Sequence, residues 1–566
     1  MATTQENGAA KPTPTPSTGS SKLHGRDFYE SIGKPKFIVA PMVDQSEFVS
    51  PLAKNPTLIV LRWAWRMLTR SFIPASEQSS LLAYTPMFHA RLFAQDDKYR
   101  SAHFQAVRPA SESKEPWLDG NPSIDRPLFV QFCANDPEYL LEAAKKAAPY
   151  CDAVDLNLGC PQGIARKGRY GAFLQEDQDL IFRLINTLHR ELPIPVTAKI
   201  RILETEEKTL AYAKNVLKAG ASILTVHGRR REQKGHLTGT ADWKMLRFLR
   251  DNLPPETVMF ANGNILQGGD IEKCLEATGA DGVMSAEGNL SDPSIFGIPP
   301  PTGEEGREYW RGKDGNGGWR VDAVTRRYLD LLHKYALEEP SAPPKRRPLF
   351  VPGDDTAWLT EAADKEEADG GDEPPRKKRK PTKRLETSPN LSAVQPHLFH
   401  LLRHFVSRHT DVRDILARSP REGMEGYERV LAAVERKVAE GLIEYERTGG
   451  RSHEDEVREL YEREDGPEGE SSVPTQKRCK RPWWVVQPII RPLPSEAMAK
   501  GAIRPSKKDL KAGESGQQQS QKGAKESSQA NGDGAKGETA PHPAVAEVQL
   551  TEQTKEIASR DELVSG

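Results

Sequence analysis

AVDLNLGC, residues 153–160, is the most informative stretch of this chain: it is a short apolar run that ends in polar residues and a cysteine. Stretches with helical character separate it from similar runs, among them PEYLLEAAKKAAPY (137–150) and LAYAKNVLKAG (210–220), which ends in a helix-stopping glycine. The other seven runs, all rich in β-branched residues, are FIVAPM (37–42), LLAYTPM (81–87), LFVQFC (128–133), PVTAKIRI (195–202), ILTVHGR (223–229), VMFANGN (258–264) and GVMSAEG (282–288).

Eight strands that alternate with helices predict an α/β fold, a (β/α)8 TIM barrel, over residues 36–300. An open, doubly wound parallel sheet is the alternative, because it is built from the same alternation. The count of eight strands in roughly 250 residues favours the barrel.

A second, smaller region is predicted to be helical. Amphipathic stretches at 321–339, 394–418 and 427–442 repeat apolar residues at near-helical spacing. We therefore expect a small helical domain made of residues 319–349 plus 392–492.

The composition indicates that other parts of the chain are disordered. Of the 566 residues only 36% are hydrophobic and the mean hydropathy is -0.65, which is low for a chain folded throughout. We assign disorder to an N-terminal arm (1–30), a charged insert (350–391) and a C-terminal tail (496–566). The net charge of -1 argues neither for nor against a polyanionic partner, because it conceals local imbalance.

The cysteines and the apolar runs exclude several classes of protein. The five cysteines form no CxxC pair, which argues against zinc ribbons and thioredoxin-like chemistry, and their low density suits a reducing compartment. No apolar run approaches the roughly 18 to 20 residues that span a bilayer. The first 25 residues resemble neither a secretory signal nor a transit peptide. We expect no metal, no membrane partner and a monomer.

The predicted strand ends carry an unusual set of residues. In a TIM barrel the C-terminal ends of the strands line the active site. A single polar residue there is commonly a cap or a solvated tip, but six or seven on one face are hard to explain by structure alone. The set is Pro41, Met42, Val43, Gln131, Asn157, Gly159, Cys160, Lys199, Arg201, His227, Asn262, Gly263, Asn264, Ala286, Glu287 and Gly288.

These residue types suit a flavin. An isoalloxazine ring needs amide donors and acceptors at its pyrimidine edge and a cation near N1, for which Gln131 and Lys199 are candidates. A flavin phosphate needs backbone N–H groups where glycine permits a close approach. The segments NGN (262–264) and AEG (286–288) supply them on the last two strands, where barrels usually hold phosphate.

Cys160 is the candidate general acid. A free thiol has a pKa of about 8.5, so it is mostly protonated near neutrality and can donate a proton. The alternative is a buried, inert cysteine, and we keep that interpretation for Cys133, Cys151 and Cys274. Cys160 instead lies between Gly159 and Pro161 in a strand-end loop, where packing gives no reason for a thiol.

At this point the chain resembles a known family, the tRNA-dihydrouridine synthases. Within that family, the last few of the stretches given below are similar to the eukaryotic class that acts on D-loop positions 16 and 17. Two stretches of the helical region, QPHLFHLLRH (395–404) and WWVVQPIIRP (483–492), are similar to the same class. Across the barrel the resemblance is carried by APMVDQSE (40–47), YTPM (84–87), VQFCANDP (130–137), DLNLGCPQGIARKGRYGAFL (155–174), VTAKIRI (196–202), LTVHGRRREQKG (224–235), ANGNI (261–265) and GVMSAEGNL (282–290).

The resemblance implies a specific chemistry. The family binds FMN in the barrel, NADPH reduces it, hydride passes to C6 of a tRNA uridine, and the loop cysteine, here Cys160, protonates C5. It implies that Asn157, Arg166, Lys167 and Arg201 face the nucleotide. It further implies that the flavin contacts are Pro41, Met42, Val43, Gln131, Lys199, His227, Asn262, Gly263, Asn264, Ala286 and Glu287.

Basic residues of the helical region are candidates for binding tRNA phosphates. They are Arg403, His404, Arg408, His409 and Arg413, with Lys477, Arg478, Lys480 and Arg481 before Trp483 and Trp484. A solvated helix face is the alternative. The near-helical spacing of His397, His400 and His404 could suggest a metal, but no carboxylate or cysteine joins them, so we expect none.

Two segments raise separate questions. PRKKRKPTKR (375–384) has the form of a nuclear localisation signal, with a charged linker or an RNA-binding arm as alternatives, so we expect the protein in the nucleus, the cytoplasm or both. FVSPLAKNPTLIVLR (48–62) interrupts the family pattern before Trp63. We hypothesise a retained intron or gene-model error, because GTAAGT, a common splice-donor sequence, encodes Val-Ser; a transcript that always contains the insert would refute this.

Two other functions stay open from the sequence. One is an FMN barrel that reduces a free pyrimidine, which needs no helical RNA platform. The other is a non-catalytic RNA-binding protein on a retired barrel, against which Cys160, Lys199 and His227 argue.

Overall fold

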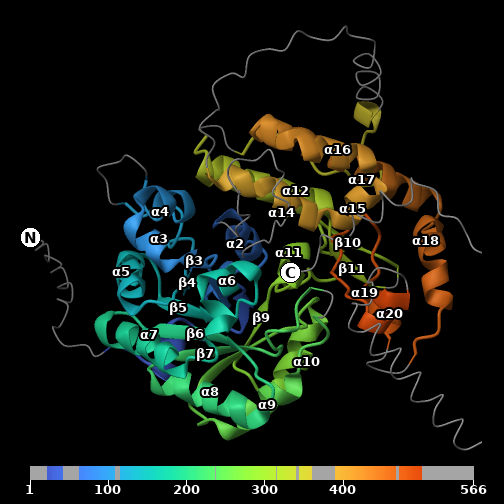
Figure 1. The fold of residues 1–566 in the computed structure, drawn as a ribbon. Coiled ribbons are helices and arrows are strands. Elements are labelled where there is room, and N and C mark those ends of the chain that lie inside the picture. The colour runs from blue at the N-terminus through green and yellow to red at the C-terminus, as the bar shows by residue number, and fades with distance from the viewer. Residues whose placement is uncertain are drawn as a thin grey trace, which may run out of the picture.

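The computed structural model describes residues 22–42, 63–108, 115–235, 238–313, 315–339, 343–359, 389–466 and 471–499 (Figure 1). Several predictions lie outside these residues: the flavin contact at Val43, the insert at 48–62, the basic segment at 375–384, and the disorder expected of residues 1–21, 360–388 and 500–566. Nuclear import therefore stays a prediction.

Eight parallel strands close into a barrel, as the sequence predicts. Each strand pairs with the next along the chain, β1 also pairs with β9, and the pairing of β2 with β4 completes the ring. Two further residues, β3 (Phe88–His89), extend the pairing along the end of β4. The eight strands are β1 (Phe37–Val39), β2 (Leu81–Tyr84), β4 (Leu128–Cys133), β5 (Ala153–Leu158), β6 (Val196–Arg201), β7 (Ile223–His227), β8 (Val258–Asn262) and β9 (Gly282–Ser285).

Helices connect the strands and surround the barrel. Several begin at a side-chain cap: Asp136 accepts from the backbone N–H groups of Glu138 and Tyr139, and Pro137 occupies the first helical turn. The helices are α1 (Gly25–Ser31), α2 (Trp63–Arg70), α3 (Ala90–Gln95), α4 (Asp97–His103), α5 (Pro137–Ala147), α6 (Gly163–Gly168), α7 (Gln178–Glu191), α8 (Glu206–Lys218), α9 (Trp243–Asn252), α10 (Gly269–Thr278) and α11 (Glu287–Ser291).

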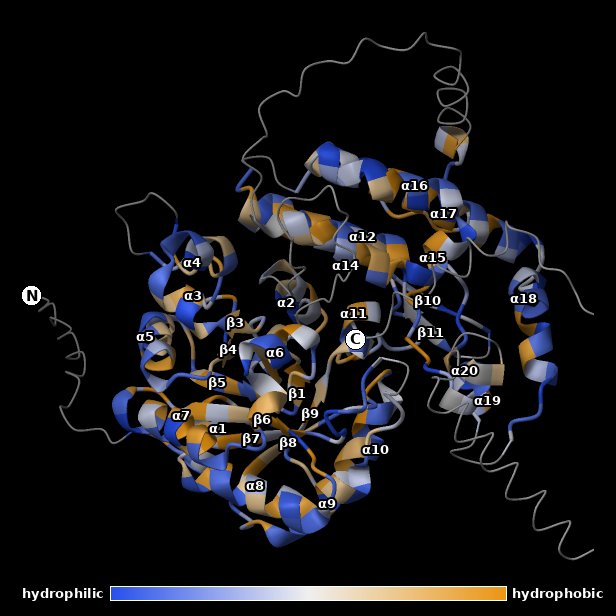
Figure 2. Cartoon of the chain, viewed as in Figure 1, coloured by the Kyte–Doolittle hydropathy of each residue, from blue (hydrophilic) through white to orange (hydrophobic). Residues whose placement is uncertain are grey.

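The period-two alternation of each strand separates two environments. On β6, Val196, Ala198 and Ile200 belong to the large core beneath the helices. Figure 2 shows the apolar colour along the strands and mixed colours on the helices around them. The alternate residues Thr197 and Lys199 are buried on the inner side, so the polar side chains of the strands collect inside the barrel.

One end of the barrel is sealed by α1. Its Phe28 and Tyr29 are buried in a cluster with inward-facing residues of the strands, and Phe28 stacks on Phe129 at 5.9 Å. An ion pair between Arg26 and Asp281 fixes the helix to the start of β9. The assignment of residues 25–30 to a disordered arm was therefore wrong, because two apolar side chains of this segment fill the bottom of the barrel.

The C-terminal region is helical, but it differs in detail from the prediction. Its expected helix at 394–418 is broken at Leu402 and His409, and His409 packs there against Phe405 and Trp483. A hairpin precedes the helices. The elements are β10 (Tyr309–Arg311), β11 (Gly317–Trp319), α12 (Val321–Leu331), a π-helical turn (Leu332–Ala336), α14 (Val394–Leu401), α15 (Arg403–Arg408), α16 (Thr410–Arg418), α17 (Met424–Arg447), α18 (Arg451–Glu462), α19 (Val473–Cys479) and α20 (Pro494–Ala499).

Two predicted disordered boundaries also move. Residues 350–359 are ordered in the structure, with Phe350 only 6% exposed, so the insert cannot begin at 350. Residues 496–499 belong to α20, and Glu496 accepts a hydrogen bond from the backbone of Ser472 at 2.8 Å. Both segments are held by contacts with distant residues that local composition does not reveal.

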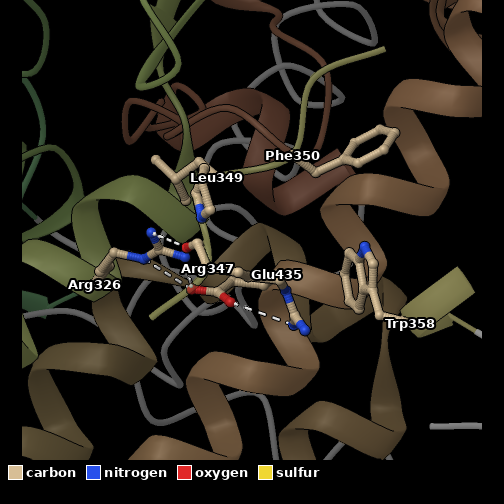
Figure 3. A pocket seen from close by; sticks show the side chains of 7 residues that line it. Arg326, Arg347, Leu349, Phe350, Trp358 and Glu435 are labelled. Carbon is tan, nitrogen blue, oxygen red and sulfur yellow. Dashed lines mark hydrogen bonds and ion pairs between the residues drawn. The ribbon is translucent and has the colours of Figure 1, made fainter. Parts of the chain in front are cut away.

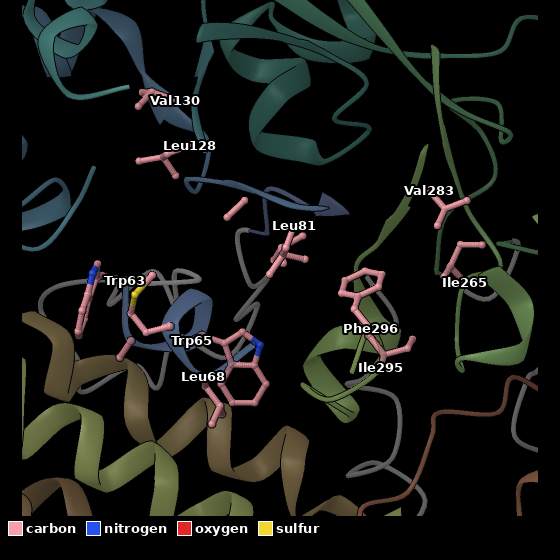
Figure 4. Close-up of a cluster of buried hydrophobic side chains, with 14 of the residues drawn as sticks. Trp63, Trp65, Leu68, Leu81, Leu128, Val130, Ile265, Val283, Ile295 and Phe296 are labelled. Atoms are coloured by element: carbon pink, nitrogen blue, oxygen red, sulfur yellow. The ribbon is translucent and has the colours of Figure 1, made fainter. Parts of the chain in front are cut away.

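Helix α2 joins the barrel to the helical region (Figure 1). The ring of Trp65 lies 4.7 Å from His397 and 5.6 Å from Tyr328, and its indole N–H donates to Asn289 on α11 at 3.1 Å. Figure 4 shows Trp63, Trp65 and Leu68 among the buried side chains of this core. Among the described residues, no helix combines the length and apolar character needed to cross a bilayer.

Candidate active site

A hydrogen-bonded network of polar side chains spans β4, β5 and β6 inside the barrel. The Gln131 amide donates to Asp155 at 2.8 Å and accepts from Asn157 at 2.8 Å. Thr197 donates to the second carboxylate oxygen of Asp155 at 2.7 Å. Because each group constrains the next, the amide of Gln131 is held in one orientation at the C-terminal end of its strand.

Cys160 lies on the loop after β5, and this network positions the loop. The Asn157 side-chain oxygen accepts from the backbone N–H groups of Gly159 at 3.0 Å and Cys160 at 2.9 Å. The carbonyl of Cys160 accepts from the N–H of Ala172 at 3.1 Å. Gly171 makes the closest approach: a Cβ there would lie 2.8 Å from that carbonyl, and its φ is +64°. Glycine at this position therefore lets the second loop press against Cys160.

Burial and the charges of cationic side chains act on the thiol of Cys160 in opposite directions. Burial raises its pKa, while the positive charges of Arg201, Lys199 and Lys234 oppose that rise. Burial and the charge of Arg201 lower the pKa of the Lys199 amine to about 7. Burial raises the pKa of the Asp155 carboxyl to about 6. The thiol is thus protonated at neutral pH. When it loses its proton, the neighbouring positive charges stabilise the thiolate that forms.

Arg201 braces the loops at the mouth. Its Nε donates to the carbonyl of Gly159 at 2.7 Å, and its Nη1 donates to that of Arg230 at 3.0 Å. The residue is 8% exposed. Arg201, which the sequence predicts to face the nucleotide, therefore also holds the Cys160 loop against the loop after β7.

The ends of β7 and β8 form a second group of functional side chains. Arg229 contacts the His227 ring at 3.1 Å and donates to the Asn264 side-chain oxygen at 2.7 Å. Gly263 has a φ of +113°, and a Cβ there would lie 3.1 Å from the His227 ring and 3.3 Å from Arg229. Burial and the neighbouring cations hold the pKa of His227 well below its usual range, so its ring is neutral.

The end of β9 completes the mouth. Gly288, in the first turn of α11, lies against the β8 loop, where a Cβ would meet the carbonyl of Ile265 at 2.4 Å. The preceding Glu287 forms an ion pair with Arg491, a residue of the C-terminal segment. The mouth is therefore built from the barrel and from a segment about 200 positions further along the chain, because residues 204 apart meet here.

A sequence profile of the dihydrouridine synthase (Dus) family matches residues 14–308. That is slightly more than half of the 566-residue chain. The chain belongs to the dihydrouridine synthase family.

Individual relatives in this family extend the match beyond the barrel. The tRNA-dihydrouridine(16/17) synthase of Schizosaccharomyces pombe is 43% identical over 476 residues, covering 84% of this chain and 92% of the relative. That of Saccharomyces cerevisiae is 44% identical over 421 residues, covering 74% and 78%. A rat protein described as tRNA-dihydrouridine(16/17) synthase-like is 46% identical over 292 residues, covering 51% and 58%. The alignment with the Schizosaccharomyces pombe relative is too long to end with the barrel, so part of the C-terminal region is shared.

The residues of the mouth fit the flavin that NAD(P)-dependent chemistry in this family implies. An oriented amide on Gln131 and a buried amine on Lys199 match the polar edge of an isoalloxazine ring. Met42 packs against the inner apolar cluster and offers an apolar surface. Gly263 and Gly288 let the strand-end loops pack closely, because an added Cβ would lie 2.6 Å from Ala241 and 2.4 Å from the carbonyl of Ile265, respectively. The donor set of Gln131 and Lys199 therefore suits a flavin ring.

The structure separates two groups among the predicted site residues. Arg166 and Lys167 are exposed on α6, on the outer rim beside the Cys160 loop, whereas Pro41 is half-buried at the C-terminal end of β1, next to Met42, and belongs with the second group. The remaining described residues converge at the C-terminal ends of the strands, where they are buried or half-buried: Met42, Gln131, Asn157, Cys160, Lys199, Arg201, His227, Asn262, Gly263, Asn264, Ala286 and Glu287.

Several basic residues of the helical region, predicted to bind tRNA phosphates, already pair with carboxylates of this chain. Arg408 pairs with Glu456 and lies over the Trp483 ring, and Lys477 pairs with Asp465 at 2.8 Å. Other members of the set also have carboxylate partners: Arg413 contacts Asp414, and Arg481 contacts Asp292. Within the described part of the chain, no group of three His, Cys, Asp or Glu side chains is placed to hold a metal.

A recess in the helical region is lined by none of the predicted site residues. It is a shallow depression between α12, α17 and the 347–358 segment (Figure 3). Arg326 donates to Glu435 at 2.6 Å, and the Arg347 guanidinium lies 3.5 Å from the centre of the Trp358 ring. These contacts hold the 347–358 segment against the helices, so we assign the recess a structural role.

Sequence reasoning missed three residues of the site. Asp155 and Arg229 could have been found, because each lies two positions from a predicted inward-facing residue, Asn157 or His227, and inward positions recur at that interval. Arg491 gave no such signal. It belongs to a segment interpreted only as part of the helical domain, and its approach to Glu287 depends on tertiary structure.

Proposed function

We propose that this chain reduces uridines 16 and 17 in the D-loop of tRNA to 5,6-dihydrouridine, with FMN as cofactor and NADPH as reductant. The observation that carries the proposal is the position of Cys160. Its thiol stands at the mouth of a closed barrel, within the electrostatic reach of Lys199 and Arg201. The names of the two yeast relatives support the choice of substrate and of positions.

When bound, FMN reduced by NADPH supplies a hydride to C6 of the uracil ring. Addition at C6 leaves negative charge on C5 and on the conjugated C4 carbonyl oxygen. Cys160 donates its proton to C5, which completes the reduction. The resulting thiolate lies near Lys199 and Arg201, whose positive charges stabilise it until it takes a proton from solvent.

The surrounding residues prepare this proton transfer. Asn157 and Gly171 place the Cys160 loop, and Arg201 ties it to the loop after β7. Lys199 would supply positive charge to the pyrimidine edge of a bound flavin. Asp155 holds the amide of Gln131 in one orientation, in which it would contact the same edge.

The substrate must be a base turned out of the RNA, because a uracil stacked in a folded tRNA cannot enter a barrel mouth. Recognition of the tRNA therefore depends on its shape and its phosphates. The exposed Arg166 and Lys167 on the rim and the helical region beside the barrel are the surfaces that we assign to this contact.

The test uses purified protein and two tRNA transcripts. We expect the visible spectrum of bound flavin, and NADPH-dependent dihydrouridine at positions 16 and 17 of an unmodified tRNA. A transcript with cytidine at both positions serves as the control and should gain none. Colourless protein would contradict the flavin, and reduction of free uracil without reduction of tRNA would contradict the substrate.

A further inference from the structure

The C-terminal segment that reaches the barrel mouth is anchored on both sides of Arg491. Upstream, the N–H of Val486 donates to the carbonyl of Trp319 at 2.9 Å. Downstream, Glu496 accepts from the N–H of Leu493 at 3.1 Å and, outside this segment, from the N–H of Ser472 at 2.8 Å. Anchors on both sides restrict where the arginine between them can lie.

Arg491 meets Glu287 at the start of α11. Its Nε donates to one carboxylate oxygen at 2.8 Å, and its Nη2 contacts the other. The side chains are 25% and 20% exposed, so the pair lies at the edge of the mouth. Among the described residues Arg491 has no other hydrogen-bond or ion-pair partner. Because a guanidinium carries five N–H donors, this pair leaves donors for a further acceptor.

Positive charge exceeds negative charge around this pair. Burial, and next the charge of Arg491, lower the pKa of the Arg229 guanidinium to about 10, while Glu287 raises it. Arg491 also contributes to holding the pKa of His227 below its usual range. Two guanidinium groups and one carboxylate therefore influence one another electrostatically, and an anion would offset this excess of positive charge.

We propose that Arg491 helps to hold the phosphate of the bound flavin, with Glu287 positioning its guanidinium. The inference rests on the proposed function, since it assumes that the flavin is FMN. Gly263 and Gly288 bring the loops after β8 and β9 into close contact here, and beside Gly263 the Arg229 guanidinium donates to Asn264 at 2.7 Å. An unpaired Glu287 would repel a phosphate here, so Arg491 both removes that repulsion and offers a planar donor edge.

Comparison of FMN with riboflavin isolates the phosphate, because the two ligands share the ring and differ by that group. We would remove the flavin from the full-length protein and titrate each ligand, following the quenching of flavin fluorescence. For Arg491→Gln we expect the FMN dissociation constant to rise by about 10- to 100-fold, the value of a hydrogen bond to a charged group. The riboflavin dissociation constant should stay near that of the unsubstituted protein.

Two further variants separate a phosphate contact from a loss of structure. Arg481→Gln removes an arginine of the same segment that pairs with Asp292 at the far end of α11. Any loss in this variant should be equal for FMN and riboflavin. The double variant Glu287→Gln with Arg491→Gln should recover part of the FMN affinity, because it removes the unpaired carboxylate.

Several results would overturn the proposal. Equal weakening of both ligands by Arg491→Gln would make Arg491 structural, and unchanged binding of both would exclude the contact. Loss of tRNA affinity with unchanged FMN affinity would assign the arginine to an RNA phosphate. Failure of the unsubstituted protein to bind either flavin would instead contradict the proposed function itself.

Discussion

The two ends of the barrel are built from the same eight strands, yet they hold opposite chemistry. At the bottom, inward-facing residues such as Phe129 and Phe260 pack with Phe28 and Tyr29 of α1 into a dry cluster. At the top, the next inward positions on the same strands are Gln131 and Asn262. The difference shows that closure of the barrel and its reactivity depend on separate layers of side chains, which substitutions can test independently.

The largest effect should come from the top layer. Cys160→Ala removes the proton donor, and we expect the rate of dihydrouridine formation to fall by about 10²–10⁴-fold, the usual contribution of a general acid. Single-turnover reduction of tRNA by the flavin-reduced protein measures this step. Cys274→Ala, which removes a buried thiol in α10 away from the mouth, should keep the unsubstituted rate. Equal loss in both variants would contradict the role of Cys160.

A substitution in the bottom layer should act on stability alone. Phe129→Ala deletes a ring that packs against Phe28 at 5.9 Å and Tyr84 at 5.3 Å, and we expect the free energy of unfolding to fall by about 3–5 kcal/mol. Denaturant unfolding measures the loss. The rate per folded molecule should stay unchanged, and a catalytic defect in the folded protein would contradict the separation of the two layers. Phe248→Ala, on the half-buried face of α9, should cost less.

The sequence predicts features that depend on neighbouring residues better than features that depend on residues far apart in the chain. All eight strands were predicted, because a buried parallel strand is a local apolar run. The inward-facing residues Gln131, Lys199 and His227 were predicted from their positions at the strand ends. The burial of Phe28 was missed, because a short polar-flanked segment shows nothing of the cavity that it fills.

The helical region was predicted less well for the same reason. An amphipathic pattern identifies the buried face of 394–418, but it does not show that the backbone breaks at Leu402 and His409. The partners of Arg408 and Arg491, namely Glu456 and Glu287, lie far from them in sequence. Long-range ion pairs of this kind leave no periodic signal in a single chain.

Gly171 offers a smaller test of how the top layer is positioned. Gly171→Ala places a Cβ 2.8 Å from the Cys160 carbonyl at a φ of +64°. We expect a loss of about 1–2 kcal/mol in the free energy of unfolding, from the left-handed conformation, and a slower proton transfer, from a displaced thiol. Gly163→Ala, in the same loop region but with no atom within 4 Å of its new Cβ, is the matched control. Unchanged single-turnover rates in Gly171→Ala would show that the loop tolerates the shift.

Burial of the charged amine of Lys199 should lower the free energy of unfolding by an amount that depends on pH. In the flavin-free protein its pKa is lowered from 10.5 to about 7, so between these values the unfolded chain holds more protons than the folded one. Stability therefore rises with pH across that window, and the destabilisation is complete only below pH 7. The free energy of unfolding of the unsubstituted protein, minus that of Lys199→Met, should grow by about 1 kcal/mol per pH unit between pH 7.5 and 9. Lys208→Met, at an exposed lysine of α8, serves as the control. A flat difference for Lys199→Met would mean that Lys199 keeps its ordinary pKa, and that the polar end of the barrel does not destabilise the fold through this charge.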